Sequence, residues 1–177
     1  MQHSHSDVLD SPWFAVYTAP RHEKQVQKHL QLRSVEHFLP VYTHQAAWKD
    51  GTRPTLQLPL FPSYLFVQIE REQRSRVLQV PGVLAIVGGT GKEPATLDST
   101  EIEMLRAGVQ LRKVEPHPVI HVGQTALIRR GPFTGKSGIV VRKKGAVRVV
   151  LTLEVIMRSI AVECDLSDIA IMGNRAS

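Results

Sequence analysis

The sequence predicts an α+β domain followed by a small β-barrel, and three observations support this division. Residues 12–112 alternate between strand-like and helix-like hydrophobic patterns, which is typical of a sheet covered by helices. Residues 113–118 hold two prolines within three positions, which stop a helix and stiffen a connection, as a linker requires. Residues 119–172 contain short β-rich runs. We expect residues 1–11 to be a flexible tail and residues 173–177 a second tail.

The first domain is predicted to be a mostly antiparallel sheet flanked by helices. The aromatic run from Trp13 to Tyr17 predicts its first strand. Pro20 suits the first turn of a helix over about residues 20–33, where Glu23, Val26 and Leu30 recur at helical spacing. The elements that follow are strands at 38–42 and 56–58 around an Asp50-Gly51 hairpin turn, a central strand ending at Ile69, a short helix at 72–80 and a strand at 85–87. Thr100 and Glu103 predict a capping box that opens a last helix ending near residue 112.

The second domain is predicted to hold five strands, at 124–130, 137–143, 146–155, 158–164 and 168–172. Between the first two, the segment from Gly131 to Gly138 resembles a phosphate-binding loop. That motif requires a glycine at position 130, where this chain has arginine, and a helix after the loop. We therefore expect a strand-to-strand turn, whose glycines and proline supply the backbone angles. A nucleotide-dependent enzyme built on Lys136 and Ser137 is disfavoured.

The net charge of +6 is concentrated in one part of the chain. Residues 119–153 carry seven basic side chains and no acidic ones, so the remainder is close to neutral. Localised positive charge is typical of a protein that binds nucleic acid or an acidic protein surface. It is equally typical of a solvated basic face, and the sequence leaves these two interpretations open.

Other features exclude several classes of protein. The chain has a single cysteine, Cys164, which we interpret as a small buried hydrophobe. His3 and His5 lack further metal ligands around them, and neither a metal cluster nor a Ser-His-Asp or Cys-His set can be argued from the sequence. Residues 1–7 lack the basic and apolar regions of a signal peptide, so we expect none, and no apolar run is long enough to span a membrane. We expect a cytoplasmic, non-enzymatic protein with no cofactor or metal.

Short motifs in both domains carry a resemblance to a known family. Gly123, Ala126 and Ile128, followed by Gly131-Pro132-Phe133 and Gly135, resemble the KOW motif of NusG transcription factors. Trp13-Phe14, residues 60–67, residues 80–83 and Gly88-Gly89 are similar to the family's N-terminal NGN domain. The chain is identified as a member of this family, which implies an SH3-like KOW barrel. Ser63 and the helix start at residues 20–24 are closer to the operon-specific paralogues typified by RfaH, because general NusG proteins usually have glycine in place of Ser63.

The resemblance implies a transcription elongation and antitermination factor that suppresses pausing and termination. Its N-terminal domain is expected to bind the clamp helices of RNA polymerase through Tyr17, Phe61, Pro62, Tyr64 and Phe66, with a second polymerase contact at Arg74 and Ser75. Arg21, His22 and Lys24 match the positions where the paralogues contact the displaced non-template DNA strand; solvated surface charge is an equally good interpretation of these three.

Strand alternation divides the predicted polymerase patch from the core. Tyr64 and Phe66 share one face of their strand, and Leu65 and Val67 share the other. We assign Leu65 and Val67 to the core and expect Tyr64 and Phe66 to be exposed. On this assignment, Tyr64→Ala combined with Phe66→Ala abolishes polymerase association and leaves the fold intact.

The barrel is implied to recruit ribosomal protein S10, the termination factor Rho, or both. The residues concerned are those of the predicted turn, Ile128, Gly131, Pro132, Phe133 and Gly135. Phe133 is either an exposed apolar knob for the partner or a plug at one end of the barrel. We expect a monomer. The alternative function is an RNA-binding or ribosome-associated KOW protein, against which the long first domain argues. The sequence leaves open whether the factor is general or operon-specific, and whether the barrel also folds as a helical hairpin.

Overall fold

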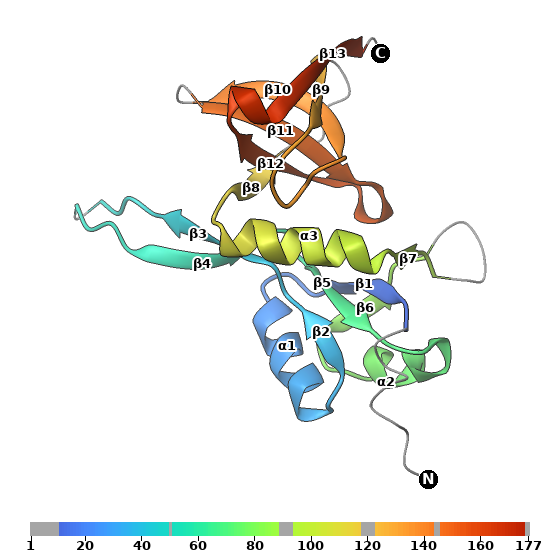
Figure 1. Cartoon of the computed structure of the whole chain (residues 1–177). Coiled ribbons are helices and arrows are strands. Elements are labelled where there is room, and N and C mark those ends of the chain that lie inside the picture. The colour runs from blue at the N-terminus through green and yellow to red at the C-terminus, as the bar shows by residue number, and fades with distance from the viewer. Residues whose placement is uncertain (1–10, 50, 89–93, 118–122, 144–145, 176–177) are drawn as a thin grey trace. The chain divides into compact units, whose positions relative to one another are not determined.

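The computed structural model describes residues 11–49, 51–88, 94–117, 123–143 and 146–175 (Figure 1). The chain divides into two compact units: residues 1–40 with 61–102, and residues 41–60 with 103–177. Helix α3 (Ser99–Gln110) runs across the boundary between them. Several sequence-based expectations lie outside the described residues. They are those for the N-terminal tail before Ser11, for Asp50 and Gly89, for residue 118 of the predicted linker, for Lys144, one of the seven basic residues counted above, and for residues 176–177 of the predicted second tail.

The first unit is built on an antiparallel sheet with strand order β2-β5-β1-β6 and with β7 paired to β1. The strands are β1 (Trp13–Thr18), β2 (Glu36–Phe38), β5 (Tyr64–Gln68), β6 (Val83–Ile86) and β7 (Thr96–Leu97). Strands β1 and β5 are central, and their aromatic and β-branched side chains are almost all buried. These two strands hold the core of the unit.

Two helices belong to the first unit. α1 (Glu23–Leu32) packs against β2 and β5 and buries Val26 and Leu30, as their spacing predicts. The helix begins three residues later than expected, because Arg21 has a left-handed φ of 66°, so Pro20 lies in the turn before the helix. α2 (Arg74–Leu78) follows a 3-10 turn, η2 (Arg71–Gln73), and packs against β6.

The start of α3 differs from the predicted capping box. Asp98 caps the helix, because its Oδ1 accepts hydrogen bonds from the Thr100 N–H (2.8 Å) and the Thr100 hydroxyl (2.9 Å). Its carbonyl also accepts the N–H groups of Glu101 and Ile102. The expectation of a Thr100–Glu103 box was therefore wrong by two residues: Thr100 already lies inside the helix, and aspartate is the better cap.

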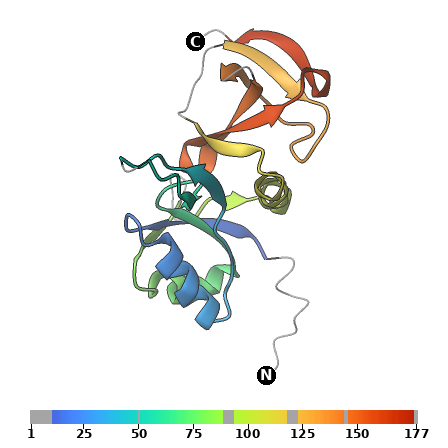
Figure 2. The ribbon, with the colours of Figure 1, turned by 90° about the vertical axis from the view of Figure 1, so that its left-hand side faces the viewer.

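The second unit holds a hairpin and a six-stranded antiparallel sheet. The hairpin pairs β3 (Val41–Gln45) with β4 (Thr55–Pro59). The sheet has the order β13-β9-β10-β11-β12-β8 and curls around a common interior, consistent with a small barrel (Figure 2). Its strands are β8 (Val114–His117), β9 (Gly123–Ile128), β10 (Ser137–Lys143), β11 (Ala146–Leu153), β12 (Arg158–Cys164) and β13 (Ile169–Arg175). Short 3-10 turns, η3 (Glu154–Ile156) and η4 (Leu166–Asp168), flank β12.

The segment expected to be a linker, residues 113–118, contains strand β8. Its residues pair with β12, and Lys113 accepts a further hydrogen bond from the Glu163 N–H (2.9 Å). β8 is an edge strand, so Pro116, which has no N–H to donate, is tolerated there. The predicted fold class, a mostly antiparallel α+β region followed by a small β-barrel, is confirmed by these two sheets.

Candidate functional site

Three loops of the first unit meet at one end of its sheet. β1 ends where β5 and β6 begin, because β1 is antiparallel to both, and the register pairs Tyr17 with Tyr64 and Thr18 with Val83. Backbone hydrogen bonds tie the loops together: Thr18 N–H donates to the Ser63 carbonyl (2.9 Å) and Ala19 N–H to the Gly82 carbonyl (2.8 Å). We call residues 17–22, 61–64 and 80–83 the loop cluster.

The loop cluster presents a pair of tyrosines. Tyr17 is 37% exposed and Tyr64 is half-buried, and their ring centroids lie 5.2 Å apart at an interplanar angle of 44°. Pro62, two residues before β5 begins, is exposed. Partly exposed aromatic rings that are already held by packing offer a large contact area at low entropic cost, so this surface suits a protein partner.

Phe61 and Phe66 are both buried and do not belong to the exposed surface. Strand alternation predicted an exposed Phe66, and the family resemblance implied a polymerase contact at Phe61. Phe66 is 0% exposed and packs on Phe38 (ring centroids 6.4 Å apart) and edge-on against Phe61 (6.0 Å). Leu65 and Val67, on the opposite face of β5, are buried as predicted. The alternation rule failed because β5 is a central strand with both faces covered, so only its first residue, Tyr64, reaches solvent.

The predicted DNA-binding residues lie in the same part of the unit. Arg21, His22 and Lys24 are all exposed, at and just before the start of α1. The His22 ring is oriented by a hydrogen bond from Nδ1 to the Pro20 carbonyl (3.0 Å). Arg74 and Ser75 are not part of the loop cluster, because they begin α2, beyond the opposite end of β5.

Glu23 has a structural role that the sequence interpretation missed. Its carboxylate is buried (5% exposed), and Oε1 accepts the Ser63 N–H at 2.7 Å, across forty residues of sequence. The available signal was its position on the buried face of α1, three residues before Val26. A carboxylate on an apolar helix face needs a donor from another element.

The turn between β9 and β10 is closed by its own backbone. Ile128 N–H donates to the Lys136 carbonyl (2.9 Å) and Gly135 N–H to the Ile128 carbonyl (2.8 Å), with left-handed φ angles at Gly131 (94°) and Gly135 (85°). β10 follows directly, so the strand-to-helix architecture of a phosphate-binding loop is absent at this described turn, as predicted.

Phe133, at the centre of this turn, is buried rather than an exposed knob. It is 4% exposed, and a Cβ added to Gly108 would come within 2.5 Å of its ring. Ile128 is also buried, whereas Gly131 and Gly135 are exposed and Pro132 is partly so. The adjoining cavity, of about 40 Å³, is too small for an organic ligand.

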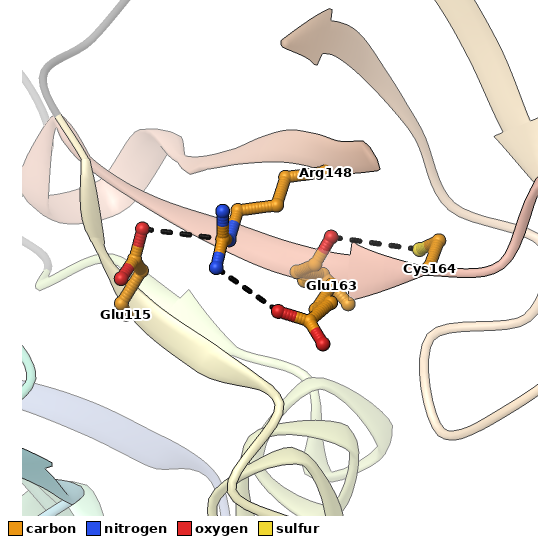
Figure 3. Close-up of polar contacts among 5 residues, drawn as sticks. Glu115, Arg148, Glu163 and Cys164 are labelled. Atoms are coloured by element: carbon orange, nitrogen blue, oxygen red, sulfur yellow. Dashed lines mark hydrogen bonds and ion pairs between the residues drawn. The ribbon is translucent and has the colours of Figure 1, made fainter. Parts of the chain in front are cut away.

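Part of the positive charge of residues 119–153 is neutralised in the second unit. Arg148 on β11 pairs with Glu163 on β12 (3.0 Å) and with Glu115 on β8 (3.5 Å), and its side chain is only 13% exposed (Figure 3). Arg129 and Arg142 are exposed, and Arg130 lies 3.7 Å from Asp168. The basic surface is therefore smaller than the residue count suggests, and Arg148 ties three strands together.

Metal and thiol chemistry find no support at the described positions. No group of three or more His, Cys, Asp or Glu side chains in the described ranges is placed to hold a metal ion. The Cys164 thiol lies near the Val162 carbonyl (3.5 Å; Figure 3). Burial raises the pKa of this thiol above the ordinary value of 9.0. A raised pKa disfavours the reactive thiolate. Within the same described ranges, no helix is long and apolar enough to cross a membrane.

Comparisons with known proteins identify the family. A family model described as "Transcription termination factor nusG" matches residues 11–106, more than half of the chain. The chain belongs to the NusG family. It is 28% identical over 138 residues to the "Transcription termination/antitermination protein NusG" of Staphylococcus aureus strain Mu50, covering 71% of this chain and 76% of the relative. The NusG of Staphylococcus carnosus strain TM300 is similar to the same extent.

The NusG-like fold is supported by a solved structure. This structure, described as "Domain interaction in Thermotoga maritima NusG", matches with a TM-score of 0.59 over 92% of this chain and 97% of that chain. At 22% identity the match shows the fold alone. The NusG family model covers the whole loop cluster, whereas the turn at residues 128–137 lies beyond it. Membership of the NusG family, expected from the motifs, is thus confirmed, and the closer likeness to RfaH stays a prediction.

Proposed function

We propose that this NusG-family protein is a non-enzymatic transcription elongation and antitermination factor, and that its loop cluster binds the clamp helices of RNA polymerase. The observation that carries the proposal is the Tyr17–Tyr64 pair, held 5.2 Å apart at an accessible end of the sheet within the segment that matches the family model. The curated relatives are named as termination and antitermination proteins. Phe61 and Phe66 contribute to this surface indirectly, because their packed rings fix the strand that carries Tyr64.

The exposed cations at the start of α1 are proposed to contact the displaced non-template DNA strand. Arg21 and His22 lie within the loop cluster and Lys24 lies next to it, and their exposure beside the proposed polymerase-binding surface supports this proposal. Phosphate contacts of this kind weaken as salt concentration rises, because counterions are released on binding. We further propose Arg74 and Ser75 as a second, separate polymerase contact, since both begin α2 with Ser75 exposed.

The β9–β10 turn is proposed to recruit a partner, either ribosomal protein S10 or Rho. Gly131, Pro132 and Gly135 form its accessible surface, and Ile128 and Phe133 hold its shape from inside. Adding purified S10 or Rho to the isotope-labelled full chain tests this point. Amide signals of Gly131 and of residues 133–135 are expected to shift with one of them, and unchanged signals with both would contradict the proposal.

A transcription assay tests the main proposal. Purified RNA polymerase from the same organism is halted and released on a template with a strong pause and a terminator, with and without the protein. We expect a shorter pause and more readthrough, together with direct binding to the polymerase. Binding to free RNA or ribosomes without any effect on the polymerase would favour the RNA-binding alternative instead.

A further inference from the structure

We infer that Glu23 is a positioning residue: by accepting the Ser63 N–H, its carboxylate fixes the turn that presents Tyr64 to the tyrosine pair, and ties that turn to the helix start that carries the exposed cations. The Oε1–N distance is 2.7 Å, a short hydrogen bond to an ionisable acceptor. Glu23 lies in the first turn of α1, next to His22 and Lys24. One side chain thus joins the turn before Tyr64 to the helix start that carries the exposed cations.

Burial makes this contact strong. Glu23 is 5% exposed, and a carboxylate withdrawn from water costs free energy unless donors replace its hydration. The Ser63 N–H is such a donor, and the unpaired N–H groups in the first turn of a helix favour a negative charge there. Removing the acceptor leaves the Ser63 N–H without this partner in a partly buried turn.

The turn has a conformation that needs support. Ser63 has a φ of 67°, in the left-handed region that a residue with a Cβ occupies at a cost. Its two backbone polar groups are both used: the N–H donates to Glu23, and the carbonyl accepts the N–H of Thr18. Tyr64 follows immediately and donates its own N–H to the Phe61 carbonyl (3.0 Å). The direction in which the Tyr64 ring leaves the strand therefore depends on the Ser63 backbone.

The consequence for function rests on the proposed polymerase binding. Thr18 donates its N–H to the Ser63 carbonyl and follows Tyr17 directly. The Glu23–Ser63 hydrogen bond, which we call the brace, therefore fixes the positions of both tyrosines of the pair. The cations precede or follow Glu23 by one or two residues. If the brace is lost, the tyrosines and the cations move independently, and a partner that contacts both loses a rigid target.

Amide hydrogen exchange at Ser63 tests the brace without any polymerase. Glu23→Met keeps the length of the side chain and removes the acceptor, whereas Glu23→Gln keeps an acceptor oxygen and serves as the matched control. We expect exchange at Ser63 to become about tenfold faster or more in Glu23→Met and to stay near the wild-type rate in Glu23→Gln. Should Glu23→Met fail to fold, Glu23→Asp, which is one methylene too short, is expected to show the same acceleration. Unchanged exchange in these acceptor-lacking or shortened variants overturns the inference.

A rescue experiment separates positioning of the turn from general stabilisation of α1. Glycine adopts a positive φ without steric cost, so adding Ser63→Gly to Glu23→Met is expected to restore part of the lost polymerase affinity. If Glu23 served only the helix, Ser63→Gly would restore nothing, which contradicts the inference. A wild-type protein that does not bind polymerase refutes the proposed function, while the exchange result at Ser63 still decides the role of Glu23.

Discussion

Replacing Phe66 by alanine is expected to lower the free energy of unfolding by about 3–5 kcal/mol. Phe66 is 0% exposed and its ring contacts both Phe38 and Phe61, so the change removes a fully buried aromatic side chain and leaves a cavity between two other rings. A buried phenylalanine removes roughly 150–250 Å² from water, which at about 25 cal/mol per Å² gives about 4–6 kcal/mol as an upper value. The range for core substitutions and the value from buried area both put this loss of stability among the largest expected for a single substitution.

Thermal unfolding followed by circular dichroism measures the effect. A domain of the size of the first unit, residues 1–40 with 61–102, loses roughly 4–8 °C in Tm per kcal/mol of stability. Phe66→Ala is therefore expected to lower the Tm by at least about 12 °C. Tyr64→Ala, two residues earlier on the same strand and half-buried, is the control and is expected to cost about 1 kcal/mol. If Phe66→Ala unfolds like the control, Phe66 is exposed, as strand alternation predicted, and the buried position described for it is wrong.

Three further predictions concern the second unit. Gly138→Ala is expected to destabilise the barrel by about 1–3 kcal/mol or more in urea unfolding, because the new Cβ would lie 2.1 Å from the Val150 carbonyl oxygen; an unchanged midpoint would contradict this contact. Arg148→Met is expected to cost about 1–2 kcal/mol, less at 1 M salt, since it leaves two carboxylates without their shared cation; a salt-independent loss would argue against the ion pairs. The raised pKa of the Cys164 thiol predicts slow reaction with a thiol reagent at pH 8, and reaction as fast as in unfolded protein would refute this prediction. The same shift contributes stability that is present below pH 9 and lost as pH rises through the folded-state pKa.

Local patterns predicted most of the elements of this fold. The strand at Trp13–Thr18, the hairpin of β3 and β4, and the barrel strands lie within a few residues of the predicted ranges, because alternation and turn residues are properties of the local sequence. Pro116 shows where this fails. Two prolines within three residues predicted a linker. At the edge of a sheet, however, a proline costs no hydrogen bond of the sheet. Only the tertiary structure shows that β8 is an edge strand.

The candidate site was predictable in its members more than in its geometry. The motif around residues 60–67 indicated Tyr64 and its neighbours, but which of them reach solvent depends on whether one or both faces of β5 are covered, and that is decided by other elements. The pairing of Tyr17 with Tyr64 follows from the register of β1 and β5, which the sequence does not specify. The buried Glu23 was accessible to a simple rule, namely that a carboxylate on an apolar helix face requires a donor.

Binding of tyrosine variants to purified RNA polymerase tests the central claim most directly. The double variant Tyr17→Ala/Tyr64→Ala removes the exposed aromatic pair, and Tyr42→Ala, a partly buried tyrosine on β3 outside the loop cluster, is the matched control. With folding checked by thermal unfolding, we expect the double variant to bind at least about thirtyfold more weakly than wild type, as for interface hot spots, and Tyr42→Ala to bind within about threefold of it. Wild-type affinity in the double variant, or an equal loss in Tyr42→Ala, would contradict the assignment of the loop cluster as the polymerase-binding surface.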